Sequence, residues 1–289
     1  MELRKIIEQI NAVSISPTAK ITQLKREEDD SFYQVWRIDT NNSKYILKKA
    51  KEHEINIYHS ILTSLKTGIP AVYQIITNEN ESYLLMEYIE GEDLCKCNRQ
   101  KLTNALDALI SIQKETWETT LWESTFDSAL QQRQDRYKYL NDPLLEKAYK
   151  QFLQVFQSTP KALCHDDLLP FNIISTEQKA VLIDWEAGGI LPYPTPFARL
   201  IAHTEENMDA LFYMSDADKS FAIDYYYDNL LKDKGVLYDD WQNTLEYFLF
   251  YEYCEWVYVG NKYNTTDGEY YKKYLPIAKK QGAKLLENY

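Results

Sequence analysis

The chain has 289 residues, of which 45% are hydrophobic and 26% charged, and both fractions are ordinary for a globular protein. This length suits a protein of two lobes better than a protein with one core. The net charge of -12 argues against non-specific nucleic-acid binding, which needs clustered Lys and Arg. We therefore expect no nucleic-acid partner, and we ascribe the acidity first to solubility and second to attraction of cationic small molecules.

The sequence also indicates neither a membrane segment nor a disulfide scaffold. The N-terminal "MELRKIIEQINAV" is charged throughout and lacks the apolar core of a signal peptide. The apolar stretch 247–259 carries glutamates and is too short to span a bilayer. Neither a zinc site nor a set of disulfides is indicated by the four cysteines, Cys95, Cys97, Cys164 and Cys254. We expect a cytoplasmic protein with reduced thiols and no membrane partner.

The first third of the chain predicts strands with one helix. Residues 34–38 and 44–49 are rich in strand-forming side chains, and the turn-forming "DTNNS" between them predicts a hairpin. Residues 52–70 then have apolar side chains at helical spacing, ending at a glycine and a proline. Residues 71–77 and 82–89 predict a second hairpin around "NENE".

After a predicted hinge at 88–91, helical patterns dominate. Residues 101–115 and 126–158 predict helices, and the chain from Pro196 to its end is mostly helical with many Tyr and Trp. Two short strands are predicted between these regions, at "NIIS" and "AVLID". The predicted fold class is α+β and bilobal. An N-terminal lobe, 1–89, has a small antiparallel sheet and one helix, and a larger, mainly helical lobe spans 90–289.

Two acidic stretches carry most of the chemistry. In "CHDDLLPFNII", Asp167 precedes Asn172 by five positions, and Asp184 ends the next strand. Carboxylate and amide oxygens at strand ends suit Mg²⁺, which takes one or two carboxylates together with phosphate oxygens and water. A further carboxylate that does not bind the metal can accept a hydroxyl proton. Phosphoryl transfer from ATP requires this division of roles.

A phosphate-binding site also needs a cation, and Lys48 is the candidate. Ile46 and Lys48 fall on the same face of the predicted strand, so the lysine points into the cleft if the isoleucine does. Lys49, the alternative, projects to the opposite face. Glu54 lies at the start of the following helix, where its carboxylate can orient the lysine.

The pattern H-x-D-x-x-x-x-N followed by "LIDWE" resembles the aminoglycoside phosphotransferase and choline kinase family, which has a protein-kinase-like fold. With "YILK" and "YLLMEYIEGEDL", the resemblance covers nearly the whole chain in the family's order. It implies that Asp167 is the catalytic aspartate and that Asn172 and Asp184 hold Mg²⁺. It also implies that Lys48 binds the ATP phosphates, with Glu54 as its partner.

On the nucleotide side, the same resemblance implies that adenine is held by the hinge backbone of Glu87 and Ile89, with Met86 behind it. The loop that covers the phosphates departs from the family pattern, because residues 25–35 contain no glycine. Asp29 and Asp30 in this loop would repel a triphosphate unless they point outward, whereas Ser31 can donate to a phosphate. GTP therefore stays open as an alternative to ATP.

Two further departures concern the catalytic lobe. Pro196 or a neighbour stands where the family often has an Asp that braces the catalytic loop, so another group must brace it here. Gln113 stands where many relatives have a His. His165 resembles a loop-structuring histidine and not a base.

The acceptor is expected to be a small molecule, because the segment between Asp184 and the next helix is too short for a peptide platform. Helical spacing places Glu252 beside Trp256, and Tyr251 beside Glu255. This helix is either an aromatic core helix or part of a cation pocket, since aromatic faces and carboxylates bind ammonium groups. Glu186, which is typical of the family, is a further candidate contact.

We therefore predict an ATP- and Mg²⁺-dependent kinase, monomeric or homodimeric, that phosphorylates a hydroxyl of an aminoglycoside-like or choline-like amine. One alternative is a non-catalytic, kinase-like binding or scaffold protein. The glycine-free acidic loop favours that alternative, and the complete set of five polar site residues disfavours it. The other alternative is a kinase of a neutral sugar, against which the acidity weighs weakly.

Overall fold

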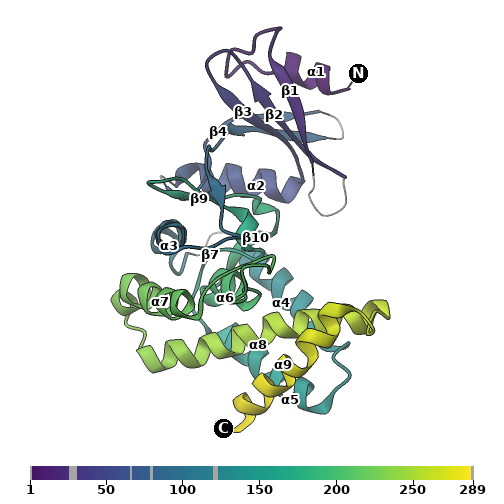
Figure 1. Cartoon of the computed structure of the whole chain (residues 1–289), viewed down its shortest axis with the longest axis vertical. Coiled ribbons are helices and arrows are strands. Elements are labelled where there is room, and N and C mark those ends of the chain that lie inside the picture. The colour runs from purple at the N-terminus through teal and green to yellow at the C-terminus, as the bar shows by residue number, and fades with distance from the viewer. Residues whose placement is uncertain (1, 26–30, 66, 79–80, 120–122, 288–289) are drawn as a thin grey trace.

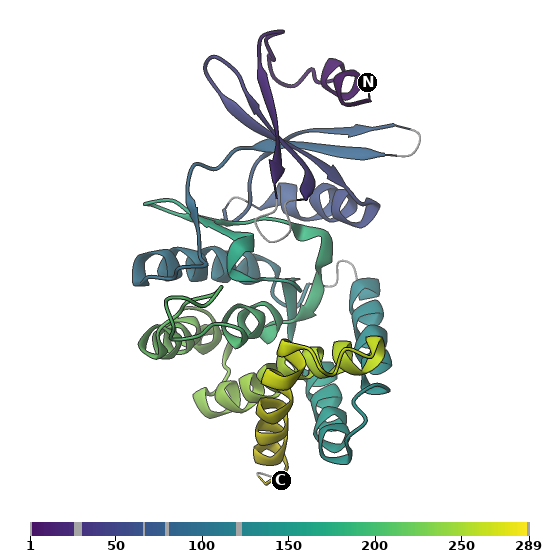
Figure 2. The same cartoon turned by 45° about the vertical axis from the view of Figure 1, so that its right-hand side comes forward.

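The computed structural model describes residues 2–25, 31–65, 67–78, 81–119 and 123–287. Its N-terminal part is a five-stranded sheet with helices, and its C-terminal part is mainly helical (Figure 1; Figure 2). The predicted α+β, bilobal fold is therefore confirmed. Over the described ranges, no helix combines the length and the apolar character needed to cross a bilayer.

The N-terminal sheet has the strand order β1-β2-β3-β5-β4, and all its neighbouring strands are antiparallel. Both predicted hairpins are present, as β2 with β3 and β4 with β5. The strands of this sheet are β1 (Lys20–Lys25), β2 (Phe32–Asp39), β3 (Lys44–Ala50), β4 (Val72–Thr77) and β5 (Ser82–Glu87).

In the described parts of the chain, helices α1 and α2 belong to the N-terminal part, and α3 to α9 follow them. The helices are α1 (Glu2–Glu8), α2 (Glu52–Ser60), α3 (Arg99–Thr116), α4 (Glu123–Tyr137), α5 (Pro143–Ser158), α6 (Pro194–Ala202), α7 (Asp216–Tyr226), α8 (Tyr238–Tyr263) and α9 (Glu269–Glu287). Short strands also form two small sheets, with one strand before α3 and the others between α5 and α6. These strands pair as β7 (Lys161–His165) with β10 (Gly188–Pro192), and as β6 (Glu92–Asp93), β8 (Ile173–Ser175) and β9 (Ala180–Leu182).

The two faces of the N-terminal sheet pack against different helices (Figure 1). Helix α1, which the sequence pattern does not predict, contributes Ile6 to a small core that contains Leu47. Helix α2 lies on the other face, where Ile57 belongs to the main core together with Leu84. Lys48 pairs across the sheet with Leu84, so its side chain lies on the α2 face, as the alternation of strand side chains predicts.

The helical stretch expected over 126–158 is divided into α4 and α5. Asp142 caps α5, because its carboxylate accepts hydrogen bonds from the backbone N–H groups of Leu144 and Leu145. Pro143 occupies the first turn of α5, where its missing N–H costs no helical hydrogen bond. The local signals for a cap and a helix start outweigh the continuous apolar pattern.

The predicted catalytic loop, "HDDLLPFN" (165–172), connects β7 to β8, and β9 is followed closely by Asp184. The β8–β9 ladder extends by one bond beyond the strands, because Ile183 N donates to Asn172 O over 2.9 Å. Asn172 and Asp184 are thereby brought to the same end of this hairpin. The fold thus places both predicted metal ligands side by side.

Candidate active site

Lys48 lies between two carboxylates that come from different parts of the fold. Its Nζ is 2.7 Å from Glu54 Oε1 on α2 and 2.6 Å from Asp184 Oδ1 after β9. The Lys48 side chain is 15% exposed and that of Glu54 only 1%. The ion pairs therefore connect the sheet, helix α2 and the segment that follows β9 in one place. Lys49, on the opposite face, pairs with Glu81 instead.

Burial and charge compete at this lysine. Burial disfavours the ammonium form, but the charges of Glu54 and Asp184 outweigh it and raise the pKa of Lys48 above its ordinary value. Lys48 is therefore a permanent cation at neutral pH. A charged ammonium group held this way can bind phosphate oxygens.

His165 anchors the start of the catalytic loop. Its Nε2 lies 2.8 Å from the Ile183 carbonyl oxygen, so this nitrogen carries the proton and donates it. Its ring packs 5.0 Å from that of Trp185, and burial lowers the pKa of His165. A buried, neutral histidine bonded to the backbone of the neighbouring segment is consistent with the predicted structural role.

Asp167 and Asn172 lie at the two ends of a tight loop. The Asn172 Nδ2 donates to the backbone carbonyl of Asp167 over 2.8 Å. Since the amide nitrogen faces that carbonyl, the side-chain oxygen of Asn172 is the atom left for a metal. The Asp167 carboxylate is 44% exposed, so it is open to an acceptor from the solvent side.

The residues present fit a Mg²⁺ ion that is shared with nucleotide phosphates. Asp184 supplies a carboxylate and Asn172 an amide oxygen, which matches the few protein ligands that Mg²⁺ takes beside phosphates and water. No group of three or more His, Cys, Asp or Glu side chains suited to a metal occurs among the described residues. An all-protein metal cage is therefore not the arrangement in this part of the chain. Asp184 itself has a left-handed backbone, with φ of 64°.

Two arginines that the sequence pattern did not single out hold the acidic pair of the catalytic loop. Arg133 Nη2 on α4 lies 2.6 Å from Asp166 Oδ1, and its buried guanidinium stacks between the rings of Phe156 and Tyr251. Arg199 on α6 lies 2.8 Å from Asp167 Oδ1. These ion pairs hold the loop, although Pro196 or a neighbour stands where a bracing Asp was expected. For Arg199, the available signal was that it is the single arginine within the apolar helix "PTPFARLIA".

The predicted adenine contacts follow β5 into the hinge. Met86 is buried on the same sheet face as Lys48, opposite Ile46. The Glu87 N–H already donates to Ala71 O over 2.8 Å, and Ile89 is partly buried. At the phosphate side, Ser31 is exposed just before β2, whereas Asp29 and Asp30 lie outside the described residues.

The predicted acceptor carboxylates are all engaged by cations. Glu186 lies 3.2 Å from Lys51 Nζ. Glu252 is buried and lies 2.9 Å from Arg199 Nη1. Glu255 lies 2.7 Å from Arg136 Nη1. Burial raises the pKa of Glu255 in spite of this arginine. Charge from these carboxylates is thus largely neutralised within the protein.

Aromatic rings gather around the fourth predicted acceptor residue, Trp256. Its ring stacks on that of Tyr270, with 4.3 Å between centroids, and on that of Tyr274 at 6.0 Å. Tyr270 is half exposed, so the edge of this stack reaches the surface. The stack joins helices α8 and α9, and Tyr253 extends it from α8.

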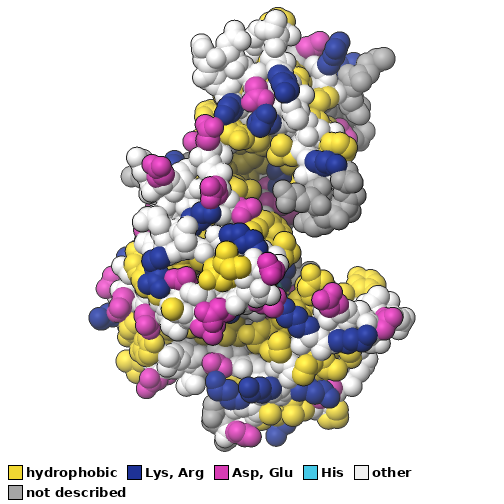
Figure 3. Space-filling view, in the orientation of Figure 1, with side chains coloured by type: hydrophobic (Ala, Val, Ile, Leu, Met, Phe, Trp, Pro, Cys, Tyr) yellow, Lys and Arg dark blue, Asp and Glu magenta, His cyan; other side chains and the backbone are white. Residues whose placement is uncertain are grey.

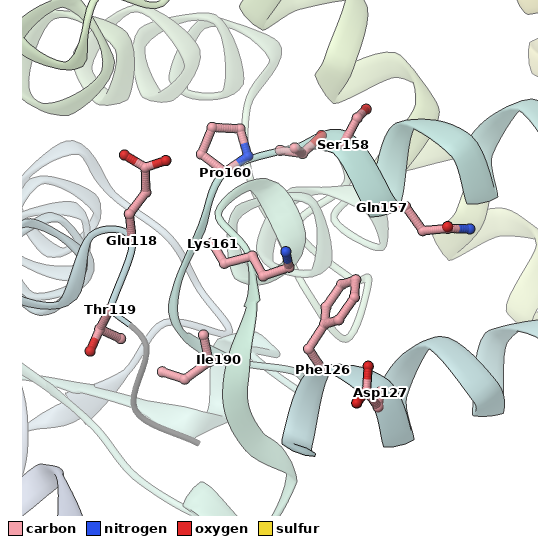
Figure 4. Close-up of a pocket in the computed structure, with 10 residues that line it drawn as sticks. Glu118, Thr119, Phe126, Asp127, Gln157, Ser158, Pro160, Lys161 and Ile190 are labelled. Carbon is pink, nitrogen blue, oxygen red and sulfur yellow. The ribbon is translucent and has the colours of Figure 1, made fainter. Parts of the chain in front are cut away.

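Figure 3 shows the surface hollowed between the sheet part and the helical part, with apolar side chains along the hollow. A different pocket, of about 500 Å³, lies where α4, α5, β7 and β10 meet (Figure 4). There the Lys161 ammonium lies 4.2 Å from the centre of the Phe126 ring, near Glu118. None of the predicted site residues lines this second pocket.

Comparison with known proteins supports the assignment of the fold. The sequence model of the "Phosphotransferase enzyme family" matches residues 22–217. A search of curated protein sequences gave no significant match. Three solved structures illustrate the likeness of the fold. An aminoglycoside phosphotransferase from Alicyclobacillus acidocaldarius has 10% identity and a TM-score of 0.60, over 99% of this chain and 94% of that chain.

A choline kinase from Cryptosporidium parvum has 14% identity and a TM-score of 0.61, over 97% of this chain and 92% of that chain. An amicoumacin kinase in complex with AMP-PNP and Ca²⁺ has 13% identity and a TM-score of 0.58, over 93% and 90%. At these identities, the structural likeness shows the fold alone.

Proposed function

This chain belongs to the phosphotransferase enzyme family, and we propose that it is an ATP- and Mg²⁺-dependent kinase that phosphorylates a hydroxyl of a small molecule. One observation carries the proposal, the placement of Lys48 between Glu54 and Asp184. A cation held by a buried carboxylate, beside a second carboxylate suited to a metal, is the arrangement that phosphoryl transfer requires.

In this proposal each polar residue has one role. Lys48, oriented by Glu54, binds the nucleotide phosphates, and Asp167 accepts the proton of the acceptor hydroxyl. Asn172 and Asp184 would hold Mg²⁺, which supplies charge neutralisation to the phosphates when it is bound. The division at residue 89, with nucleotide contacts in 1–89 and the catalytic loop and acceptor in 90–289, follows from these roles.

The reaction is a single displacement at phosphorus. The acceptor oxygen forms a bond to the γ-phosphorus, and the bond from this phosphorus to the β–γ bridging oxygen breaks with its electron pair on ADP. The hydroxyl proton passes to Asp167, which later releases it to water. The products are the phosphorylated acceptor, ADP and a proton, so the step balances without a further reactant.

Adenine is proposed to lie beside Met86 at the hinge. Because the Glu87 N–H is used by Ala71, the Glu87 carbonyl is the group we assign to the adenine amino group, together with the Ile89 N–H. Ser31 is proposed to donate to a phosphate. ATP is preferred over GTP in this proposal because the family relative cited above holds an adenine nucleotide analogue.

For the acceptor we propose an amine-bearing alcohol, and the aromatic stack at Trp256 supports it. Exposed faces of Trp and Tyr attract ammonium groups. Because Glu186, Glu252 and Glu255 form ion pairs within the protein, acidic charge is weak support for a cationic acceptor. The aromatic rings are the main support. A cytoplasmic setting is supported by the four free cysteines, and the protein is proposed to act as a monomer or homodimer.

The test is ADP release by the purified protein with ATP and Mg²⁺ across aminoglycosides, choline, ethanolamine, thiamine and neutral sugars. Asp167→Ala should abolish turnover and leave the thermal shift caused by ATP and Mg²⁺ intact. A signal for one amine, absent in the variant, supports the proposal.

A signal only with a neutral sugar would replace the acceptor class. Absence of both turnover and an ATP-dependent thermal shift would support the non-catalytic, kinase-like alternative. Normal turnover by Asp167→Ala would show that the base is assigned to the wrong residue.

A further inference from the structure

Helix α6 carries one charged side chain in an otherwise apolar or uncharged sequence. All other residues of α6 are buried, and the Arg199 side chain is 18% exposed. A guanidinium taken out of water needs partners for its donors, since burial of an unpaired charge is strongly unfavourable. The identity of those partners therefore indicates what Arg199 does.

Arg199 uses two of its donors on a single oxygen of the proposed base. Its Nε lies 3.0 Å and its Nη2 2.8 Å from Asp167 Oδ1. Both donors belong to the rigid planar fork of the guanidinium, so together they restrict the rotation of the carboxylate. The second carboxylate oxygen, Oδ2, takes no part in this contact and is available to an acceptor hydroxyl.

The third donor of Arg199 ties the pair to helix α8. Its Nη1 lies 2.9 Å from Glu252 Oε2, and the same oxygen lies 3.3 Å from His203 Nε2. Burial alone would raise the pKa of Glu252, but Arg199 and His203 outweigh it and hold the pKa below its ordinary value. Glu252 is thus a buried anion whose nearest partners are this arginine and His203.

The chain of contacts continues from His203 toward the aromatic stack. His203 Nδ1 lies 3.0 Å from the Tyr274 hydroxyl, and Tyr274 stacks on Trp256. One polar path therefore runs from the exposed carboxylate of Asp167 through α6 and α8 to α9. Every group along this path after Asp167 is mostly buried, which favours a fixed geometry.

We propose that Arg199 is a positioning residue for phosphoryl transfer, which holds Asp167 by Oδ1 so that Oδ2 receives the acceptor proton, and that Glu252 acts through Arg199. This inference rests on the proposed function of Asp167. It gives Glu252 a role in orienting the base in place of direct contact with a cationic acceptor. Arg199 would thus hold Asp167 in a chain in which Pro196 or a neighbour stands where the family often has a bracing Asp.

The test compares Arg199→Ala, Arg199→Lys and the control Arg99→Met in the full chain, with the acceptor that wild type phosphorylates in the panel. Misplacement of a reacting group by about 1 Å costs about 100-fold, and we expect that loss of kcat for Arg199→Ala. The KM for ATP should change less than about twofold, because Arg199 does not contact the nucleotide site. The kcat of Arg199→Lys should lie between those of wild type and Arg199→Ala, since an ammonium group keeps the charge but lacks the planar fork of the guanidinium.

Chemical rescue separates positioning from folding. Methylguanidinium added to Arg199→Ala should restore turnover at least about tenfold, because it can occupy the vacated site beside Asp167 and Glu252. It should not affect Asp167→Ala. Arg99 has a half-exposed side chain that pairs with Asp218, so it serves as the control, and its replacement should leave kcat unchanged.

A readout without turnover tests the contact itself. The melting temperatures of Asp167→Asn, Arg199→Met and the double variant should be non-additive, as expected for residues in direct contact. Additive shifts overturn the inference, and so does a kcat of Arg199→Ala within about threefold of wild type. A loss of kcat without rescue, equal in Ala and Lys variants, would assign Arg199 to folding alone. A wild type that phosphorylates nothing overturns the proposed function, and this catalytic role with it, whatever the melting temperatures give.

Discussion

The ammonium group of Lys48 lies 2.6 Å from Asp184 Oδ1, although 136 positions separate the two residues in the chain. The contact joins the N-terminal sheet to the segment that follows β9 in the helical part. Replacement of Lys48 by Met should remove the cation that binds phosphates and leave Glu54 buried without its partner. We expect kcat/KM for ATP to fall about 100-fold or more. ADP release and the ATP-dependent thermal shift measure both consequences.

The neighbouring lysine offers a matched control for this variant. Lys49 lies on the opposite sheet face and pairs with Glu81, so Lys49→Met removes the same charge one position away. Its turnover and nucleotide-dependent thermal shift should equal those of wild type. Equal losses in the two variants would mean that Lys48 acts through the stability of the sheet and not at the phosphates.

The metal assignment predicts a specific dependence on Mg²⁺ for Asp184→Asn. Removing the only proposed carboxylate ligand should raise the Mg²⁺ concentration for half-maximal ADP release by at least about tenfold. A titration of Mg²⁺ at saturating ATP measures this shift. Asp228→Asn, which removes an exposed carboxylate paired with Lys232, is the control. An unchanged Mg²⁺ requirement in Asp184→Asn would exclude it as a ligand.

Local patterns were sufficient to predict both hairpins of the N-terminal sheet and the face of Lys48. The period of two along β3 separates Lys48 from Lys49, and turn residues mark both hairpins, so neighbouring residues contain the necessary information. Helix α1 is different, because seven residues are too few to be stable alone and depend on the packing of Ile6 against the sheet. The sequence pattern therefore contained little signal for it.

The partners of buried charges could not be predicted in the same way. Arg199 and Asp167 are 32 positions apart, and Arg133 and Asp166 are 33 apart. No period along the chain relates such residues, since only the packing of α4 and α6 around the loop brings them together. For the same reason, helical spacing predicted that Glu252 lies near Trp256, but it did not indicate that Arg199 on α6 pairs with Glu252 on α8.

The buried ion pair of Arg133 predicts a stability effect at the catalytic loop. Asp166→Asn would leave a guanidinium that is only 1% exposed without its counter-charge, and we expect a loss of about 3 kcal/mol in the free energy of unfolding. Urea unfolding measures it. Asp135→Asn breaks the exposed pair with Lys138 and should cause no measurable change. Similar small effects in both variants would contradict the buried-pair interpretation.

The histidine of the catalytic loop predicts a pH dependence of stability. Burial lowers the pKa of His165 in the folded protein, so the unfolded chain binds a proton that the folded chain does not. The contribution is fully present above about pH 6.5 and declines as the pH falls below that value toward the folded pKa. As the pH is lowered from 8 to 5, the stability of His165→Gln should therefore fall less than that of wild type. The difference should arise below about pH 6.5. If the free energy of unfolding, measured with urea, changes equally with pH in the two proteins, this prediction is contradicted.

Close packing of α8 against α9 predicts the effect of adding one methyl group. Gly260 on α8 faces Tyr271 on α9, and a Cβ at Gly260 would lie 2.9 Å from the Tyr271 Cγ, inside any normal contact. Gly260→Ala should therefore destabilise the protein by about 1 to 3 kcal/mol, although alanine is the better helix former by about 1 kcal/mol. Urea unfolding of the single variant measures the net cost.

A double variant decides whether the ring causes that cost. In the background of Tyr271→Ala the clash is absent, so Gly260→Ala should there become neutral or stabilising through helix propensity alone. Two residues in direct contact are expected to give non-additive changes in unfolding free energy. Additive losses would place the origin of the destabilisation elsewhere on α8, and the close approach of the two helices at Gly260 would then be excluded as its cause.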